Sequence, residues 1–118
     1  MHVTAPSDRV GIRFHGSLPS LPATSLSRAV LPGTVQLPPD GKPILLLCDA
    51  QTIGGYPVLG QVIAADLPRA AQLRPGDTVC FSETTLADAH RLYRHQHDIL
   101  ATAKQGITHA LGLAGKAE

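Results

Sequence analysis

The sequence predicts a mainly β fold with one C-terminal helix, and three observations support this prediction. The chain has 11 glycines and 10 prolines among 118 residues, a proportion that favours short strands joined by many turns. Short apolar alternations typical of half-buried strands recur between residues 10 and 82. Residues 86–104 alone repeat apolar side chains at the three- and four-residue steps of a helix face. We therefore expect at least five strands in a barrel or half-barrel, followed by this helix.

The composition excludes several other classes of protein. Apolar residues make up 43% of the chain, enough for a small core, and the formal net charge of +1 gives no sign of nucleic-acid binding. Cys48 and Cys80 are too few for a disulfide framework, and the longest apolar run, residues 44–48, is far shorter than the ~20 residues that span a bilayer. The first nine residues lack the features of a secretory signal. We expect one domain in the cytoplasm, without nucleic-acid or membrane partners.

The expected strands are separated by residues with strong turn preferences. Asp40-Gly41 suits the positive φ values of a tight hairpin turn, and residues 74–77 (Arg-Pro-Gly-Asp) have the residue types of a type II turn. Residues 44–48 are continuously apolar, as in a strand that is buried on both faces. Gly60 is a candidate β-bulge within its strand. The expected strands span residues 10–14, 34–37, 44–48, 58–64 and 78–82.

Capping residues and glycine divide the rest of the chain. Asp66 is expected to cap a short helical turn over residues 66–72, with Pro68 in its first turn. Thr85 followed by Asp88 resembles a capping box, and Gly106 is the expected end of the helix. These signals predict an N-terminal tail over residues 1–6, a domain over 7–105 that ends in a helix at about 86–104, an irregular loop over 17–27 and a flexible tail over 106–118.

The strongest local signal for binding is the segment Asp49–Pro57, which directly follows the expected buried strand. It offers four polar groups: the carboxylate of Asp49, the amide of Gln51, the hydroxyl of Thr52 and the phenol of Tyr56. Gly54-Gly55 allows the backbone to adopt positive φ or to approach a ligand closely. Such a loop can bind a urea, amide or carboxylate group through hydrogen bonds. The same residue types are equally compatible with a strand-to-strand turn whose glycines serve geometry only.

Other charged residues and the histidines carry weaker signals. Arg9 and Arg13 flank an expected strand, where fixed guanidinium groups can clamp a carboxylate, although two exposed strand arginines would give the same pattern. His90, His95 and His97 lie on the expected helix, but none is paired at the four-residue step that places two metal ligands side by side. We therefore expect these histidines on a solvated face and no metal site.

Several segments resemble one known family in their order along the chain. They are Ser7–Phe14, Leu31–Pro38, Gly41–Ile44, Asp49–Pro57 and Ala65–Asp77, of which Gln51-Thr52-Ile53-Gly54-Gly55-Tyr56-Pro57 is the most specific. Over about residues 7–100 the chain resembles the biotin-dependent carboxyltransferase family, which includes allophanate hydrolase subunit 2, the C subunit of 5-oxoprolinase and KipA-type proteins. Ile53 stands where the family commonly has Thr, which removes one hydroxyl from the loop.

This resemblance implies a cyclophilin-like β-barrel that ends in a helix. It implies either the transfer of a carboxyl group from carboxybiotin to a urea-like nitrogen, or a supporting role in ATP-dependent 5-oxoproline hydrolysis by a larger complex. Biotin would be carried by a partner domain and ATP would be used by the whole complex, so neither cofactor is intrinsic to this chain. The implied partner is a sister subunit, similar to allophanate hydrolase subunit 1 or to the B subunit of 5-oxoprolinase.

The chain matches only the C-terminal part of the family pattern, and the expected N-terminal half is absent from it. A fragment, a split subunit and a truncated gene product remain open, as does a non-catalytic KipA-type module that binds a sister subunit or a kinase inhibitor. Apolar surface that the absent half would cover should make the chain form a homo-oligomer or aggregate. We expect the site at the Asp49–Pro57 loop, with Gln51 and Thr52 on a urea- or lactam-like group, Gly54, Gly55 and Tyr56 beside it, Arg9 and Arg13 as anion clamps, and the catalytic residues unassigned.

Overall fold

A computed structural model describes residues 1–22 and 26–113 of the chain, in two units that comprise residues 1–82 and 83–118. Within the described residues, the first unit holds seven short strands and two short helices, and the second holds one long helix. The strands are β1 (His2–Val3), β2 (Gly11–His15), β3 (Arg28–Ala29), β4 (Thr34–Gln36), β5 (Ile44–Leu46), β6 (Ile53–Gly54) and β7 (Val58–Gln61). The helices are the 3₁₀ turn η1 (Ala64–Asp66), α1 (Leu67–Ala70) and α2 (Leu86–Ala110).

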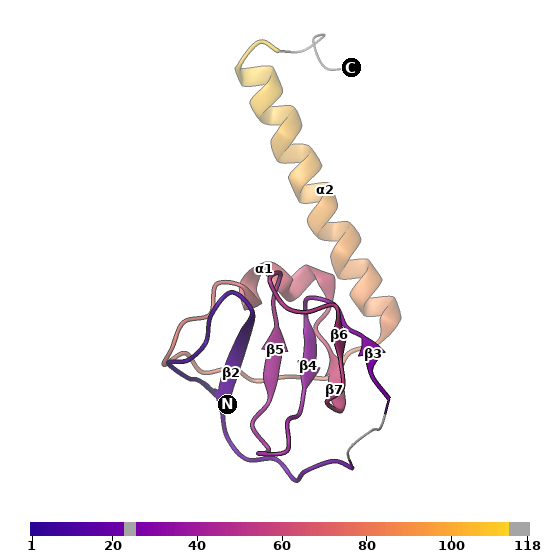
Figure 1. The fold of residues 1–118 in the computed structure, drawn as a ribbon. Helices are drawn as coiled ribbons and strands as arrows, with labels where there is room; N and C mark the ends of the chain where they lie inside the picture. Colours follow the sequence, from indigo (N-terminus) through magenta and orange to yellow (C-terminus); the bar gives the residue numbers. More distant parts are fainter. Residues whose placement is uncertain (23–25, 114–118) are drawn as a thin grey trace. The chain divides into compact units, whose positions relative to one another are not determined.

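Five of these strands form one antiparallel sheet in the order β1-β2-β5-β4-β7, and β3 pairs with β6 in a separate two-stranded ladder. Figure 1 shows β2, β5 and β4 side by side in the middle of this unit. The register places Ile12 opposite Leu45 and Leu45 opposite Val35, so that three apolar side chains form a row across three strands. This row fixes the face of the sheet that turns to the core.

The main core lies on that face of the sheet. Ile12 and Phe14 point inward from β2, whereas Arg13 between them is exposed, as the alternation of side chains along a strand requires. Phe14 is fully buried, and its ring meets that of Phe81 edge to face, with the centroids 5.6 Å apart. The core cluster consists of Val3, Ile12, Phe14, Val35, Leu45 and Ala70.

Strand β4 is also buried on its second face. Thr34 and Gln36 point away from Val35, and they are only 5% and 2% exposed. The Thr34 hydroxyl donates a hydrogen bond to Gln61 Oε1 at 2.8 Å. Gln36 lies beneath the backbone of Gly54 in β6, so the β3–β6 ladder covers this face.

The structure confirms the mainly β prediction with a C-terminal helix, and it has a turn at both expected positions. The first turn is not a tight two-residue hairpin, because residues 37–43 separate β4 from β5 and Asp40 has no positive φ. Gly41 and Gly76 have φ values of +74° and +94°, which glycine adopts without strain. Asp77 N donates to Arg74 O at 3.0 Å and so closes the second turn. The register shift between Val35 and Gln36, opposite β7, supports the bulge expected near Gly60. Closure of the sheet into a cyclophilin-like barrel remains a prediction.

Four expectations about the β unit are wrong. His2 and Val3 are not part of a tail but form β1, which pairs with β2. The expected strand over residues 78–82 is reduced to one bridge, between Thr78 and His2, because its partner segment among the described residues is the short N-terminal strand. Asp66 makes no side-chain hydrogen bond as a cap of α1. The strand expected over residues 58–64 also ends earlier, at Gln61, and Val62 N then donates to Gly33 O.

Helix α2 begins as expected, but it ends later. Asp88 N donates to Thr85 Oγ1 at 3.1 Å, which confirms the capping residue. The helix continues through Gly106 to Ala110, because an internal glycine costs only about 1 kcal/mol against alanine. The left-handed residue after the helix is Gly112, with a φ of +63°. The predicted loop over residues 17–27 and tail over 106–118 lie partly outside the described residues, at 23–25 and 114–118.

The core predicts a large cost for truncating Phe14. Phe14→Ala should lower the free energy of unfolding by about 3–5 kcal/mol, because it removes a fully buried ring and leaves a cavity. Leu31→Ala is the matched control, since Leu31 is 66% exposed, and it should change stability by about 0.5 kcal/mol or less. Urea denaturation followed by circular dichroism measures both variants, and equal effects would contradict this placement of the core.

Candidate functional site

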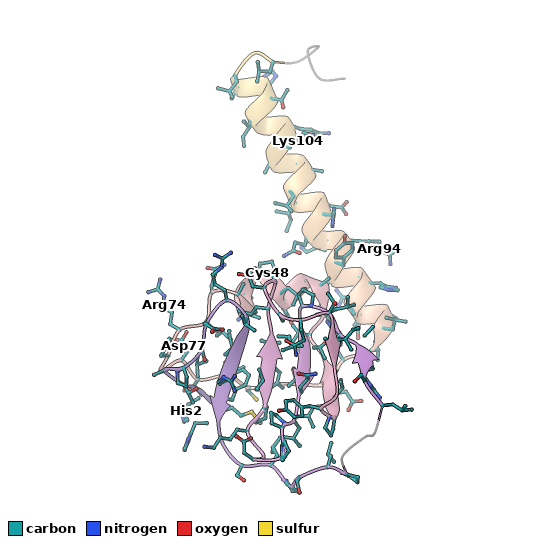
Figure 2. The ribbon with its side chains drawn as sticks, viewed as in Figure 1. His2, Cys48, Arg74, Asp77, Arg94 and Lys104 are labelled. Atoms are coloured by element: carbon teal, nitrogen blue, oxygen red, sulfur yellow. The ribbon has the colours of Figure 1, made fainter. Side chains whose placement is uncertain are left out.

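The Asp49–Pro57 segment is fixed at its start by the residues that lead into β2. Leu47 N donates to Val10 O at 3.0 Å, and Asp49 N donates to Arg9 O at 3.3 Å. The Asp49 carboxylate also pairs with the Arg9 guanidinium, at 3.0 Å between Oδ2 and Nε. Both side chains are exposed, so this ion pair adds little stability and the backbone bonds carry the attachment. Figure 2 labels Cys48, which immediately precedes this segment.

The middle and the end of the segment are held by the two neighbouring ladders. Val30 N donates to Thr52 O at 3.0 Å, and the next two residues form β6 against β3. Leu37 N donates to Pro57 O at 2.8 Å, which ties the end of the segment to the chain after β4. A loop with backbone bonds along its length presents its side chains in a defined arrangement.

The adjacent glycines have a different role from the one expected. Neither Gly54 nor Gly55 has a positive φ, so that part of the expectation is wrong. Gly54 is required by packing, because a Cβ atom built there would collide with Nε2 of the buried Gln36. A Cβ at Gly55 would lie 3.8 Å from Ser27 Oγ, an ordinary contact. The close approach that Gly54 allows is therefore to the sheet beneath it.

A pocket of about 660 Å³ lies over this segment. Its size falls within the range of small-molecule sites, about 300–1,000 Å³. Among the described residues, its wall combines apolar side chains with one amide, one phenol and one hydroxyl, and it includes no acidic or basic side chain. The lining residues are Ser20, Leu21, Leu37, Pro39, Gln51, Ile53, Gly54, Gly55, Tyr56 and Pro57.

The structure brings four of the eight predicted site residues to this pocket: Gln51, Gly54, Gly55 and Tyr56. Thr52 and Asp49 belong to the same segment but do not line the pocket. Arg9 lines a smaller cavity of about 240 Å³, together with Ile12 of β2 and residues that follow α1. Arg13 is exposed opposite Ile44, at the start of β5, whereas Asp49 follows the end of β5.

Sequence reasoning missed the lining residues that come from other parts of the chain. Leu37 and Pro39 follow β4, and Ser20 and Leu21 belong to the expected irregular loop. The sequence signal that could have indicated them is the apolar run Leu37-Pro38-Pro39, which directly follows a strand. Leu37 at the start of this run pairs with Pro57. Within the described residues, no group of three or more His, Cys, Asp and Glu side chains has a metal-binding arrangement.

Comparison with known proteins identifies the class. Residues 1–83 match the family described as carboxyltransferase domain, subdomain A and B, and the chain belongs to this family. The segment 51–57 and the pocket built on it lie within the matched residues. The family resemblance of the sequence is thereby confirmed.

Two relatives carry a more particular name. The chain is similar to the C subunit of 5-oxoprolinase from Haemophilus influenzae, with 49% identity over 90 residues, which is 75% of this chain and 29% of the relative. It is 38% identical over 98 residues to the C subunit of 5-oxoprolinase from Escherichia coli K12, covering 80% of this chain and 31% of the relative. The chain thus spans about a third of the length of these relatives.

Solved structures agree with this assignment. Crystal structures of TTHA0988 in space groups P212121 and P6522 superpose with TM-scores of 0.53 and 0.54, at 39% sequence identity. Each match covers 64% of this chain and 15% of the other chain. In the part of the chain that the structure describes, no helix has the length and apolar character needed to cross a membrane.

The packing beneath the pocket predicts different responses from the two adjacent glycines. Gly54→Ala should destabilise the protein by about 1–3 kcal/mol, because the added methyl group meets the buried Gln36 amide. Gly55→Ala should change stability by about 0.5 kcal/mol or less, because its space is open. Urea denaturation measures both, and the Gln36 side-chain amide signal in an NMR spectrum should shift in Gly54→Ala only. Equal stability of the two variants would contradict this packing.

Proposed function

We propose that the chain contributes a substrate-binding wall to a protein similar to the C subunit of 5-oxoprolinase, and that the pocket over residues 51–57 binds the ring amide of 5-oxoproline or a similar lactam. Two independent observations support this proposal together: the residues that line the pocket, and the names of the relatives. The most specific segment of the family resemblance, Gln51–Pro57, supplies six of the ten described residues that line the larger pocket. Both relatives are named as the C subunit of 5-oxoprolinase.

The chemistry of the pocket suits a neutral amide group. A primary amide such as that of Gln51 has both a donor and an acceptor, which complement the C=O and N–H of a lactam or of urea. Tyr56, Ile53, Leu37 and Pro57 supply apolar surface against which a small ring can pack. A substrate carboxylate would need a cation from outside the pocket, since no Arg or Lys lines it. We propose Arg9 and Arg13 as the residues that would supply this positive charge.

The residues that line the pocket also determine which cofactors could bind in it. The ureido ring of biotin offers the hydrogen-bonding groups of urea, so a biotin carried by a partner domain is compatible with the pocket. A nucleotide polyphosphate needs cations or a glycine-rich phosphate loop, and the pocket has neither. We therefore place ATP elsewhere in the complex. Since the chain spans about a third of its relatives, we propose that catalysis requires the remaining residues of such a protein and a sister subunit.

A second function, a non-catalytic binding module, makes a different prediction for the same pocket. An interaction module would bind a sister subunit through its surface without recognising a small lactam. Nothing in the geometry favours this alternative over the substrate pocket. Ligand binding by the pocket therefore separates the two.

Titration of the chain with 5-oxoproline tests the proposal. In ¹⁵N-labelled protein, the amide signals of Gln51, Ile53 and Tyr56 should shift with added 5-oxoproline and stay fixed with proline, whose ring lacks the C=O. Gln51→Ala should weaken binding roughly 5- to 150-fold, since it removes a hydrogen bond from a desolvated site.

Thr52→Ala is the matched control, because Thr52 is the adjacent polar residue and lies outside the pocket lining. It should leave the affinity within about threefold of the original, a difference typical of residues outside a contact. Unchanged spectra up to millimolar 5-oxoproline, or the same loss in both folded variants, would overturn the assignment of the pocket.

A further inference from the structure

Helix α2 carries a long apolar surface that no other described element of its own unit covers. It runs from Leu86 to Ala110, which is 25 residues and about 37 Å in length, and no residue of it is buried. Large side chains are well exposed along it: Leu86 at 73%, Leu100 at 62%, Ile107 at 60% and Ile99 at 56%. Helices gain most of their stability by packing such a face against another element. The spacing of the apolar residues on α2 indicates which element packs against it.

The apolar positions of α2 follow a seven-residue repeat that only Gln96 interrupts. Steps of three and four residues alternate from residue 86 to residue 110, which is the spacing of a coiled-coil seam. The first position of each repeat is always large: Leu86, Tyr93, Leu100 and Ile107. The fourth position is always smaller: Ala89, Gln96, Ala103 and Ala110. The helix holds between three and four repeats of this kind, the length over which such a pattern indicates a coiled coil.

These two rows are complementary to themselves when a second copy runs in the opposite direction. With the two-fold axis at Asp98, the antiparallel pairs are Leu86 with Ala110, Tyr93 with Ala103, Leu100 with Gln96, and Ile107 with Ala89. Each layer then combines one large and one smaller side chain, so the helix axes keep one distance along the whole contact. A two-fold dimer is self-complementary in this way, because each residue of a pair occurs on both copies.

A parallel pairing does not have this property. It would place large residues opposite large ones, such as Tyr93 opposite Tyr93, and alanine opposite alanine in the layers between them. The axes would have to separate and approach in alternate layers, which leaves gaps at every alanine layer. In the antiparallel dimer each of the four pairs occurs twice, which makes eight layers. A shift of the antiparallel register by one repeat keeps the size match but loses two of these layers. The sequence therefore selects one direction and one register.

The charges of α2 are placed where this contact leaves them in water. Asp88, Arg91, Arg94 and Asp98 all fall on the outer positions of the repeat, and Asp88 pairs with Arg91 at 3.5 Å. Figure 2 shows Arg94 and Lys104 projecting from the helix. One flank of the seam is apolar, with Leu92 and Ile99, and the antiparallel direction brings Ile99 against Ile99 of the second copy. Lys104 is the one formal charge beside the seam, so closing it desolvates few charges.

We propose that α2 is a homodimerisation helix, which binds a second copy of this chain in an antiparallel coiled coil centred on Asp98. Two helices of this length in contact bury on the order of 1,000 Å² in total, about the lower limit for a biological interface. The occupant is a second copy rather than an unrelated segment, because the sequence of α2 matches its own reversed order layer by layer. This proposal is independent of the ligand of the pocket.

Sedimentation equilibrium of the 118-residue chain over a wide range of concentrations tests the dimer. The chain should fit a monomer–dimer equilibrium. Leu100→Glu should weaken association about tenfold or more, because it places a carboxylate in the seam. Gln105→Glu adds the same charge to the outer face and should change the dissociation constant by about threefold or less. A chain that remains monomeric at the highest concentrations, or equal effects of the two variants, would overturn the proposal.

Disulfide trapping tests the direction of the helices. With Cys48 and Cys80 replaced by Ser, Ala89→Cys and Ile107→Cys are prepared as separate proteins. Under mild oxidation, a mixture of the two should form a mixed disulfide dimer, and neither variant alone should form a comparable amount. Efficient cross-linking of each variant with itself would indicate a parallel pair and overturn the antiparallel register. Circular dichroism of the reduced proteins checks that α2 is intact in both.

Discussion

Strand β4 is enclosed on both faces and along both edges, and the arrangement of the β unit depends on this enclosure. Its edges pair with β5 and β7, Val35 enters the main core, and Thr34 and Gln36 are covered on the other side. A strand without a solvated face or a free edge cannot move without disturbing four neighbours. The pocket residues Leu37 and Pro39 continue directly from it, and β6 rests on it through Gly54. The pocket therefore has a rigid floor.

The buried amide of Gln36 is the one polar conflict in this floor. Its Nε2 has no hydrogen-bond partner among the described residues, although the atom is inaccessible to water. An unsatisfied buried donor costs about 1–3 kcal/mol, and an apolar side chain of similar shape would avoid this cost. Sequences break local rules of this kind mainly at functional or strained positions. The conflict lies immediately below Gly54, a pocket residue, and it adds a physical reason to place the functional centre at this end of the sheet.

The features that sequence reasoning predicted well are those decided within a few residues. The alternation around Arg13, the turn at Asp40-Gly41 and the cap at Thr85 each depend on local geometry, and each is present. The strand expected at residues 78–82 failed because a strand exists only with a partner, and the partner is two residues long. The end of α2 was misplaced because one glycine is a weak signal inside a long helix.

The candidate site divides in the same way. Gln51, Gly54, Gly55 and Tyr56 are close in sequence and form one wall of the pocket, so a local motif was sufficient to find them. The opposite residues come from segments that meet the motif only through pairing across the sheet. The reason that Gly54 is glycine was also beyond local reasoning, because it depends on a side chain 18 positions earlier in the chain.

The pairing of the first residues with the last residues of the β unit has a consequence for the order of folding. Val3 N donates to Asp77 O, Gly76 N donates to Val3 O, and Val79 N donates to Met1 O. These bonds join positions that are more than 70 residues apart, so the chain must close its longest loop to form them. During synthesis the first strand leaves the ribosome long before this partner exists. Native pairing of residues 1–3 with residues 76–79 is therefore among the last events of folding, whereas their pairing with β2 closes only a short loop.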